Sequence, residues 1–575
     1  MVFWDWIVIG LYFSTLLGMA WWVISQRQDS SADYFLAGRN VGWFAVGCSL
    51  FASNIGSEHL VGLAGTGAND GVAMAHYELH AWCLLILGWV LVPFYARSLV
   101  FTMPEFLERR YTPAARWFLS LVSLISYVFT KIAVSLFAAG IVFQTLFPEP
   151  LLGNLSNFWL GAIGVVVVTG IYTVLGGLRA VVYTDMIQAG VLIVGSIMLT
   201  AYGLNALGGW GELYNICGSD MFNLWKPLTT QEFTLANVLW TEQKFPWLGM
   251  LFCAPVVGLW YWCTDQYIVQ RTLAAPNQTQ ARRGTIFGAY LKLLPVFLFI
   301  VPGMIAYALA KSGGVYAGLL EPGASNQAYP MLVRNLLPAG LRGLVVGALL
   351  AALMSSLASV FNSCSTLFTI DIYKKMYPKA TEHTLVWVGR IATSIMVMFG
   401  LIWIPLITMM SDTLYEYLQS VQAYIAPPIA AVFFFGVFSR RVNAKGCMTG
   451  LIAGFVIGMF RLGCEICTKS TQPGGLLENN AFLSRLFADG TFLNGLATIN
   501  FLYFSMMLFT ICVIFITGVS LLTGAPAPAK IQGLTFATLS AEDRRITRAS
   551  WNKWDVIHTS TVILLILIAY LYFRG

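Results

Sequence analysis

The segment Phe51-Ala-Ser-Asn-Ile-Gly-Ser-Glu-His59 is a polar, glycine-containing interruption of an apolar run that extends from Val41 to Gly65. Hydrocarbon cannot hydrogen-bond the peptide groups that a break in a helix sets free. Non-helical backbone at membrane depth is therefore stable only where protein encloses it or where it lines a cavity. Broken helices near the bilayer midplane are typical of secondary transporters, in which they form the binding site. The segment predicts such a site.

The composition independently indicates a polytopic membrane protein. Hydrophobic residues make up 58% of the chain and charged residues only 10%, and the mean hydropathy is +0.73. A soluble domain of this length does not reach these values. The sequence has no phosphate-binding loop, no zinc-hydrolase motif and no nucleophile elbow, so it predicts neither an enzyme nor an ATP-driven pump.

The apolar stretches predict fourteen membrane-spanning helices, since a helix needs about twenty residues to cross the hydrocarbon core. They lie near residues 4–24, 41–65, 78–97, 117–147, 158–176, 182–207, 247–269, 285–310, 341–370, 385–408, 413–438, 446–461, 498–523 and 554–573. The first stretch carries Asp5 where a cleaved signal peptide would carry basic residues, so we expect it to be retained.

The positions of Lys and Arg predict the orientation. About two thirds of the 33 basic residues fall in alternate connections, and such connections are cytoplasmic by the positive-inside rule. These connections lie near 25–40, 97–116, 177–180, 271–283, 374–390, 440–445 and 526–554. Both termini and the loops around 208–245, 311–340 and 462–497 are then expected outside. The rule also accounts for the formal charge of +7 without a nucleic-acid partner.

A second interrupted span, residues 246–269, follows five spans after the first and contains Pro255 and Gly258. Proline and glycine are often tolerated as simple kinks in membrane helices. Equivalent segments separated by an odd number of crossings run in opposite directions, however, and this predicts inverted repeats of five helices. We expect one transmembrane domain over 1–575. Its parts are an extra N-terminal helix and loop (1–40), repeat one (41–207), repeat two (246–438) and extra C-terminal helices (446–575).

Oxygen-bearing side chains recur at helical spacing within the span 341–370, which places them on one helix face. They are Ser355, Ser359, Asn362, Ser363 and Thr366. One interpretation is close helix packing, with the hydroxyls bonded to the preceding turn. The other is a site for a hard cation such as Na⁺, which takes oxygen ligands from hydroxyls and from the carbonyls of an unwound helix. The spacing leaves both interpretations open.

A resemblance to a known family rests on segments spread along the chain. They are Phe51-Ala-Ser-Asn-Ile-Gly-Ser-x-His59, Gly62-Leu-Ala-Gly-Thr-Gly67, Leu259-Trp-Tyr-Trp-Cys-Thr-Asp-Gln-Tyr-Ile-Val-Gln-Arg271, Tyr290-Leu-Lys-Leu-Leu-Pro295, Gly340-Leu-Arg-Gly343, Leu353-Met-Ser-Ser356, Phe361-Asn-Ser-x-Ser-Thr-Leu-Phe-Thr-x-Asp-Ile-Tyr373 and Tyr417-Leu-Gln-Ser420. From about Phe35 to Thr523 the chain resembles the solute:sodium symporter family, and most of all bacterial-like members of its sodium/glucose cotransporter branch. The resemblance implies an all-α integral membrane fold with inverted five-helix repeats (the LeuT-type fold), a discontinuous first helix in each repeat, and alternating access.

The resemblance also implies a sugar site. Carried over position by position, the family's sugar contacts fall on Asn54, His59, Glu78, Tyr261, Trp262, Lys292 and Gln419. Charged groups and amides can bind hexose hydroxyls while an aromatic ring covers the C–H face. Glu78 and Lys292 lie in apolar spans, where an idle charge is expensive, although a structural ion pair is the alternative interpretation.

The family's sodium site would use backbone carbonyls and two hydroxyls. The matching positions are Ala52, Ile55, Ala352, Ser355 and Ser356. A second sodium position in some relatives would fall on Ser53, Asp185 and Ser359, but Ala358 stands where a further hydroxyl is expected. Losing one oxygen ligand weakens a hard-cation site. We therefore expect one Na⁺, as the co-transported ion, for each sugar.

Departures from the family pattern leave the solute open. Glu58 stands where glucose carriers have a small residue, and in this the chain resembles the inositol carriers of the family. Gly258 stands where relatives have a polar side chain, and the pair Leu79-His80 that follows Glu78 also differs from the family pattern. Glucose or galactose is the first expectation. A sodium-coupled myo-inositol or polyol carrier and a sugar-gated ion-conducting sensor are the alternatives. We expect sodium, a sugar and the lipid bilayer of the cell membrane as partners (the inner membrane if the source is bacterial), with no nucleic acid and no obligate protein partner.

Overall fold

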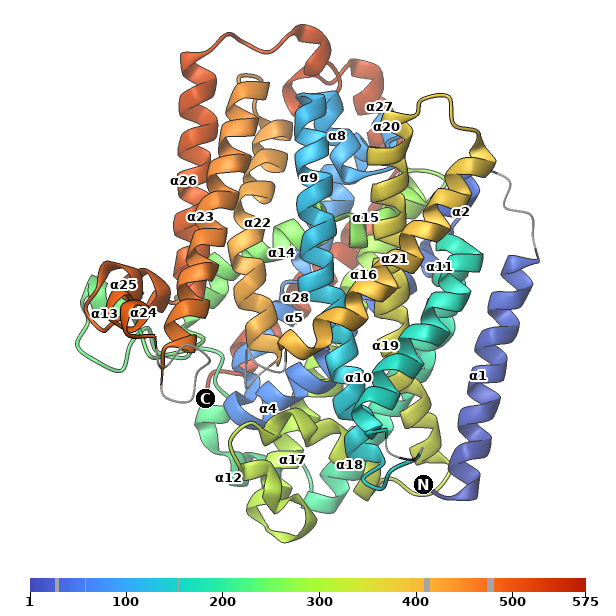
Figure 1. Ribbon diagram of the computed structural model, residues 1–575, viewed down its shortest axis with the longest axis vertical. Helices are drawn as coiled ribbons and strands as arrows, with labels where there is room; N and C mark the ends of the chain where they lie inside the picture. Colours follow the sequence, from blue (N-terminus) through green and yellow to red (C-terminus); the bar gives the residue numbers. More distant parts are fainter. Residues whose placement is uncertain (26–29, 57, 152, 154, 408–413, 473–479) are drawn as a thin grey trace.

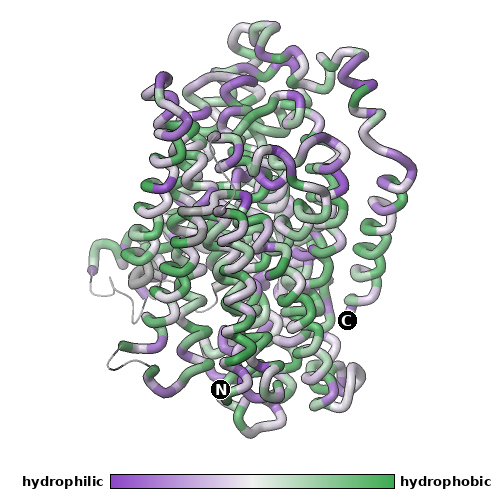
Figure 2. The backbone as a smooth tube through the Cα atoms, turned by 90° about the vertical axis from the view of Figure 1, so that its right-hand side faces the viewer, coloured by the Kyte–Doolittle hydropathy of each residue, from purple (hydrophilic) through white to green (hydrophobic). Residues whose placement is uncertain are grey.

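The computed structural model describes residues 1–25, 30–56, 58–151, 153, 155–407, 414–472 and 480–575. Within these residues the regular structure is helical, and an isolated bridge joins Asn223 to Arg574. The long helices lie roughly along the longest axis of the molecule (Figure 1). Figure 2 shows hydrophobic residues along the length of these helices and many of the hydrophilic residues towards the two ends. This arrangement is that of a helical membrane protein.

The first half of the chain forms several spans from successive helical pieces. The helices are α1 (Phe3–Ile24), α2 (Ser31–Leu36), α3 (Trp43–Asn54), α4 (Ala64–Asp70), α5 (Ala75–Leu79), α6 (Trp82–Ile86), α7 (Val92–Ser98), α8 (Met103–Arg110), α9 (Pro113–Ser126), α10 (Ala133–Leu146), α11 (Asn157–Leu207), α12 (Trp210–Met221) and α13 (Leu235–Leu239). Wider π-helical turns occupy Glu58–Leu63, Leu87–Leu91 and Tyr127–Ile132. π-helical turns are rare and frequently mark functional sites.

The second half repeats this interrupted construction and then continues as long, regular helices. The helices are α14 (Ala254–Cys263), α15 (Gln266–Leu273), α16 (Gln278–Lys292), α17 (Val301–Lys311), α18 (Ala328–Leu336), α19 (Leu341–Thr366), α20 (Lys374–Met376), α21 (Glu382–Ile407), α22 (Leu414–Phe438), α23 (Ala444–Ser470), α24 (Ala481–Leu486), α25 (Phe492–Thr498), α26 (Phe501–Leu522), α27 (Ala541–Ala549) and α28 (Lys553–Tyr572). π-helical turns occupy Gly249–Cys253, Val296–Ile300 and Leu367–Tyr373.

Eleven helical segments in the described part of the chain are long and apolar enough to cross a membrane. Two more of the fourteen expected spans correspond to shorter apolar helices, Asn157–Ile171 and Gly249–Cys263. The remaining one, 41–65, is divided between α3, a π-helical turn and α4. The expected spans 158–176 and 182–207 are two helices that meet at a kink within α11, where Gly177 leaves helical geometry with a φ of 54°. Glycine adopts that backbone conformation without a steric penalty.

Both expected interruptions exist, and each leaves a helix end inside the protein. α3 stops at Asn54 because Ile55 turns to extended backbone with a ψ of 91°. α14 stops at Cys263, and Asp265 caps the following helix by accepting a hydrogen bond from the backbone N–H of Tyr267. α3 packs against α11, α16 and α19, and α14 packs against α22. The two interrupted helices are therefore enclosed by the bundle, as breaks at membrane depth must be.

α19 lies at the centre of the bundle and is buried over almost its whole length. Helices α1 and α28 lie at the periphery, where they expose large apolar side chains such as Trp21 and Leu571. The connecting segments with many basic residues, which include α8, α20 and α27, gather at the upper end in Figure 1. The N- and C-termini are both drawn in the lower half. The extra C-terminal segments thus stay attached to the same bundle.

Close helix packing through glycine predicts one sharp stability difference within α23. A Cβ atom at Gly458 would overlap the backbone carbonyl of Tyr424 on α22, whereas nothing lies within 4 Å of a Cβ at Gly463. Gly458→Ala should destabilise the protein by about 1–3 kcal/mol because the two helices must separate. Gly463→Ala, the matched control, should be neutral or slightly stabilising. Thermal unfolding midpoints of the purified variants measure the difference, and equal midpoints would contradict the packing described for these helices.

Candidate functional site

A cavity of about 40 Å³ lies beside the interruptions of α3 and α14. Its walls are Asn54, Glu58, His59, Tyr77, His80, Lys131, Val257, Gly258, Tyr261, Trp262, Lys292, Tyr415, Leu418, Gln419 and Gln422. Six of the seven residues that the sequence assigned to a sugar line it. The seventh, Glu78, is fully buried directly behind the wall. The structure thus brings the whole predicted set together.

Glu78 organises the polar wall of the cavity. Its carboxylate accepts a hydrogen bond from Lys292 Nζ at 2.6 Å and lies 3.3 Å from His59 Nε2. The Tyr415 hydroxyl donates to the same carboxylate at 3.4 Å. Asn54 Nδ2 lies 3.3 Å from His59 Nε2, so the last residue of α3 is linked to the cluster. Four separate segments are therefore held around one buried charge, which is satisfied by its partners.

Aromatic rings also line the cavity, and cations lie over two of them. Lys292 Nζ lies 5.3 Å from the centre of the Trp262 ring, and Lys131 Nζ lies 4.5 Å from the Tyr261 ring. Tyr261 and Trp262 pack edge to face with centroids 5.0 Å apart. A cavity lined by donors, acceptors and aromatic rings suits a small molecule that has several hydroxyls and an apolar face.

One charged pair in the cavity went unassigned in the sequence analysis. Lys131 Nζ lies 3.7 Å from Glu58 Oε1, and both side chains are buried. Lys131 falls within the apolar stretch 117–147, so the rule that intramembrane charges are functional would have found it. Leu418, Tyr415 and Gln422 gave no comparable signal, because such residues on an apolar helix are ordinary core residues.

Candidates from both expected sodium positions meet in a network around Asp185. Its buried carboxylate accepts hydrogen bonds from Ser49 at 2.6 Å, Ser355 at 2.5 Å and Ser53 at 3.4 Å. Ser53 Oγ in turn lies 3.0 Å from Ser359 Oγ. The network joins the end of α3 to α11 and α19. Its atoms are all oxygens, which is the ligand type that a hard cation requires.

The remaining sodium candidates lie at the same junction. Ser356 Oγ donates to the backbone carbonyl of Ser53 at 3.4 Å, so α19 touches the last turn of α3. Ala52 and Ile55 belong to that turn and its end, and Ala352 lies one turn before Ser356 on α19. All three are buried. No group of three or more His, Cys, Asp or Glu side chains suited to a metal occurs in the residues that the structure describes.

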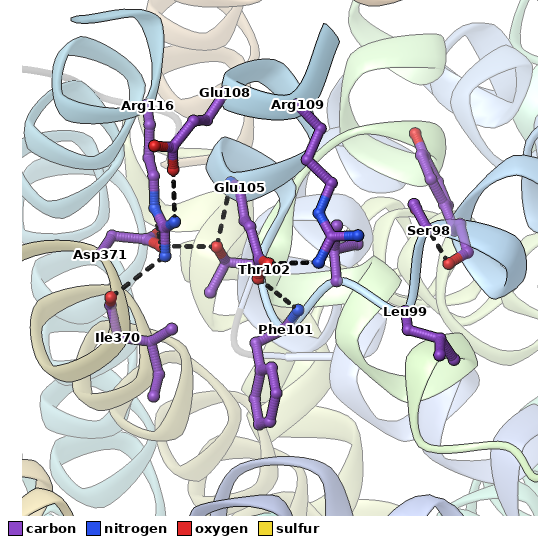
Figure 3. A network of polar contacts seen from close by, with 12 residues as sticks. Ser98, Leu99, Phe101, Thr102, Glu105, Glu108, Arg109, Arg116, Ile370 and Asp371 are labelled. Carbon is purple, nitrogen blue, oxygen red and sulfur yellow. Dashed lines mark hydrogen bonds and ion pairs between the residues drawn. The ribbon is translucent and has the colours of Figure 1, made fainter. Parts of the chain in front are cut away.

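A second polar network lies at the end of the molecule where the basic segments gather (Figure 3). Asp371, fully buried in the π-helical turn after α19, accepts hydrogen bonds from Arg116 Nε and Thr102 Oγ1, each at 2.7 Å. Arg116 Nη1 also reaches Glu108 at 2.6 Å, and Lys375 Nζ donates to Glu108 at 2.6 Å. Burial raises the pKa of Glu108, but the hydrogen bonds from Lys375 and Arg116 outweigh it and leave the pKa below its usual value. The network ties α8 and α9 to the end of α19.

Known proteins are similar to this chain over nearly its whole length. Residues 34–454 match the model of the Sodium:solute symporter family. Sodium/glucose cotransporter 1 of Ovis aries is 37% identical over 562 residues, which cover 94% of this chain and 82% of that protein. Sodium/myo-inositol cotransporter 2 of Oryctolagus cuniculus is also 37% identical, over 570 residues that cover 92% and 78% respectively. Overall identity therefore does not separate a hexose from inositol.

A solved structure shares the fold. It is the substrate-bound outward-open state of a Na⁺-coupled sialic acid symporter, and it superimposes with a TM-score of 0.71. The superposition covers 91% of this chain and 98% of that one, at 20% sequence identity. This likeness confirms the expected all-helical transporter fold.

The buried pair between Glu78 and Lys292 predicts a non-additive pair of substitutions. Glu78→Gln or Lys292→Met alone leaves one charge buried without its partner, which costs ~3–5 kcal/mol. The double variant removes both charges, so its thermal midpoint without added solute should lie above that of either single variant. Lys244→Met, which breaks an exposed pair with Glu416 at 3.1 Å, is the control and should change stability by ~0–1 kcal/mol. Additive losses in the double variant would show that the pair is not energetically coupled.

Proposed function

The chain belongs to the sodium:solute symporter family and is a sodium-coupled solute symporter of the glucose and myo-inositol cotransporter branch; we propose that it imports a hexose, glucose or galactose, with one Na⁺ per sugar. One observation carries the hexose proposal. The cavity beside the two helix breaks joins a buried carboxylate and an ammonium to aromatic rings. Membership of the family supports sodium coupling, and the residues that line the cavity support a solute with several hydroxyls.

The polar groups of the cavity match a ring of hydroxyls. Gln419 Oε1 and His59 Nδ1 are buried without a hydrogen-bond partner among the described residues. A buried polar atom that stays unpaired costs ~1–3 kcal/mol, so a solute that satisfies both gains that energy on binding. The Trp262 ring offers a surface for the C–H face of a pyranose. On this proposal Asn54, Glu78, Tyr261 and Lys292 complete the sugar site.

A myo-inositol or polyol carrier is the second candidate, and the pair of Glu58 with Lys131 favours it. Inositol carries a hydroxyl on each of its six ring carbons, and a second charged pair at the cavity can bind the additional one. A sugar-gated ion-conducting sensor is the third candidate. It would need the same cavity, and differs only in that ions pass without stoichiometric movement of sugar.

One Na⁺ supplies enough energy for uptake. A single charge that crosses ~100 mV releases about 2.3 kcal/mol, and a tenfold sodium gradient adds roughly 1.4 kcal/mol. Their sum supports a sugar gradient of several hundred-fold, at about 1.4 kcal/mol per decade. Ala352, Ser355 and Ser356, with the carbonyls of Ala52 and Ile55, form the proposed site. Ser53, Asp185 and Ser359 would form a second one, which Ala358 leaves a hydroxyl short.

Alternating access requires that the cavity open to one side at a time. On the positive-inside rule the end with α8, α20 and α27 is cytoplasmic, and both termini are extracytoplasmic. The network of Asp371, Arg116 and Glu108 lies at that end. We assign it the role of a latch, which ties α9 to the end of α19 and must open before the solute leaves on the cytoplasmic side.

Uptake into proteoliposomes tests the proposed function. With an inward sodium gradient, labelled glucose should accumulate above its external concentration, and a sodium ionophore should abolish this. Galactose should compete better than myo-inositol, and the reversal potential should indicate one charge per sugar. Accumulation of inositol in place of glucose would select the second candidate. Sodium current without accumulation would select the sensor, and a wild-type ratio of two charges would refute the role given to Ala358.

The sodium site predicts a selective effect of one hydroxyl. Ser356→Ala should raise the sodium concentration for half-maximal uptake on the order of tenfold, which corresponds to about 1.4 kcal/mol of lost ligand energy. Sugar affinity at saturating sodium should change little. Ser365→Ala is the control, because its hydroxyl lies on the same helix but donates to the carbonyl of Gly389 on α21 at 2.8 Å. If both variants keep the wild-type sodium activation curve, Ser356 is not a ligand.

A further inference from the structure

His80 is a buried residue of the cavity wall to which no role has been assigned. It follows α5, two residues after Glu78, and is 1% exposed. Neither ring nitrogen has a hydrogen-bond partner of good geometry among the described residues, although the carbonyl of Met250 faces the ring. Buried polar groups are nearly always paired, so an imidazole left in this state needs an explanation.

The imidazole lies next to the position that a side chain at residue 258 would take. A Cβ atom at Gly258 would lie 3.7 Å from His80 Nδ1 and 3.8 Å from His80 Cβ. It would also lie 3.2 Å from Cys83 Sγ, which is already tight. A side chain larger than alanine at position 258 would therefore compete for space with Cys83 and with the imidazole. Because Gly258 has no side chain, it leaves room for the His80 imidazole at this end of the cavity.

Neighbouring rings fix the orientation of the imidazole. The Tyr77 ring packs edge-on to it with centroids 5.8 Å apart, and the Trp82 ring does so at 6.0 Å. The Nδ1 edge faces Gly258, which itself lines the cavity. A ring held in this way loses little conformational entropy when it binds a ligand, so its contribution to affinity is large for one hydrogen bond.

We propose that His80, accommodated by Gly258, is a specificity-determining residue that hydrogen-bonds one hydroxyl of the transported sugar or polyol and closes that end of the cavity to larger substituents. This inference rests on the proposed function. It adds a contact that the resemblance to the family did not supply, at a position where this chain departs from the family pattern. An analogue that lacks the hydroxyl leaves the imidazole unpaired and binds more weakly, as sites built for a hydroxyl reject its absence.

The test is equilibrium binding to the purified full-length protein in saturating sodium. The ligands are glucose, galactose, myo-inositol and the monodeoxy analogues of whichever binds. The wild type should bind one analogue about tenfold more weakly than its parent. His80→Ala should bind parent and analogue equally, and Gly258→Val should do the same with His80 still present, because we expect valine to displace the ring. His80→Asn, which keeps a smaller hydrogen-bonding group, should retain part of the discrimination.

His76→Asn is the matched control. His76 is equally buried, but its ring is already paired with the Tyr570 hydroxyl and the Leu224 carbonyl, each at 2.9 Å, and it does not line the cavity. This variant should keep the wild-type pattern of analogue affinities. Wild-type discrimination in both His80 variants, or the same change in His76→Asn, would overturn the assignment while sugar binding stands. Failure of the wild type to bind any ligand of the panel would instead refute the proposed function and this inference with it.

Discussion

The structure depends on one constraint, which is that peptide groups released at a helix break must find partners without water or lipid. The chain meets it by placing the ends of α3 and α14 inside the bundle. At the end of α3, the Ser53 carbonyl accepts hydrogen bonds from the Tyr267 hydroxyl and from Ser356 Oγ. Side chains from the second repeat thus satisfy backbone from the first. The polar groups that satisfy the two helix breaks are also the groups from which we propose that the ion and solute sites are built.

The two breaks also explain how a cation and a solute can be coupled. Consecutive residues of α3 face different partners, since Ser53 belongs to the network around Asp185 and Asn54 contacts His59 at the cavity. On the proposed assignment of the two sites, a cation that orders the last turn of α3 also positions the polar wall for a solute. The coupling path is a single peptide unit long, so it needs no extended chain of rearrangements.

The sequence predicted the features that follow from local rules. Interrupted apolar runs gave both breaks, and charges within apolar stretches identified Glu78 and Lys292 before their contact was known. Pairings that depend on packing were not predictable, such as that of Ser355 with Asp185, which requires α11 to lie against α19. The sequence also could not show that candidates for both sodium positions, Ser355 and Ser53, meet at Asp185. It could not show either that the spans 158–176 and 182–207 meet directly at Gly177, because apolar length does not reveal how two helices are connected.

The buried charges at the solute cavity include two opposite pairs, Glu78 with Lys292 and Glu58 with Lys131. Their sum is zero, so a neutral solute enters a cavity that carries a dipole but no net charge. The transmembrane electric field therefore exerts no net force on this part of the carrier when it reorients without cargo. Charge that the protein itself moves through the field then comes from groups outside these two pairs, among them Asp185 in the neighbouring oxygen network.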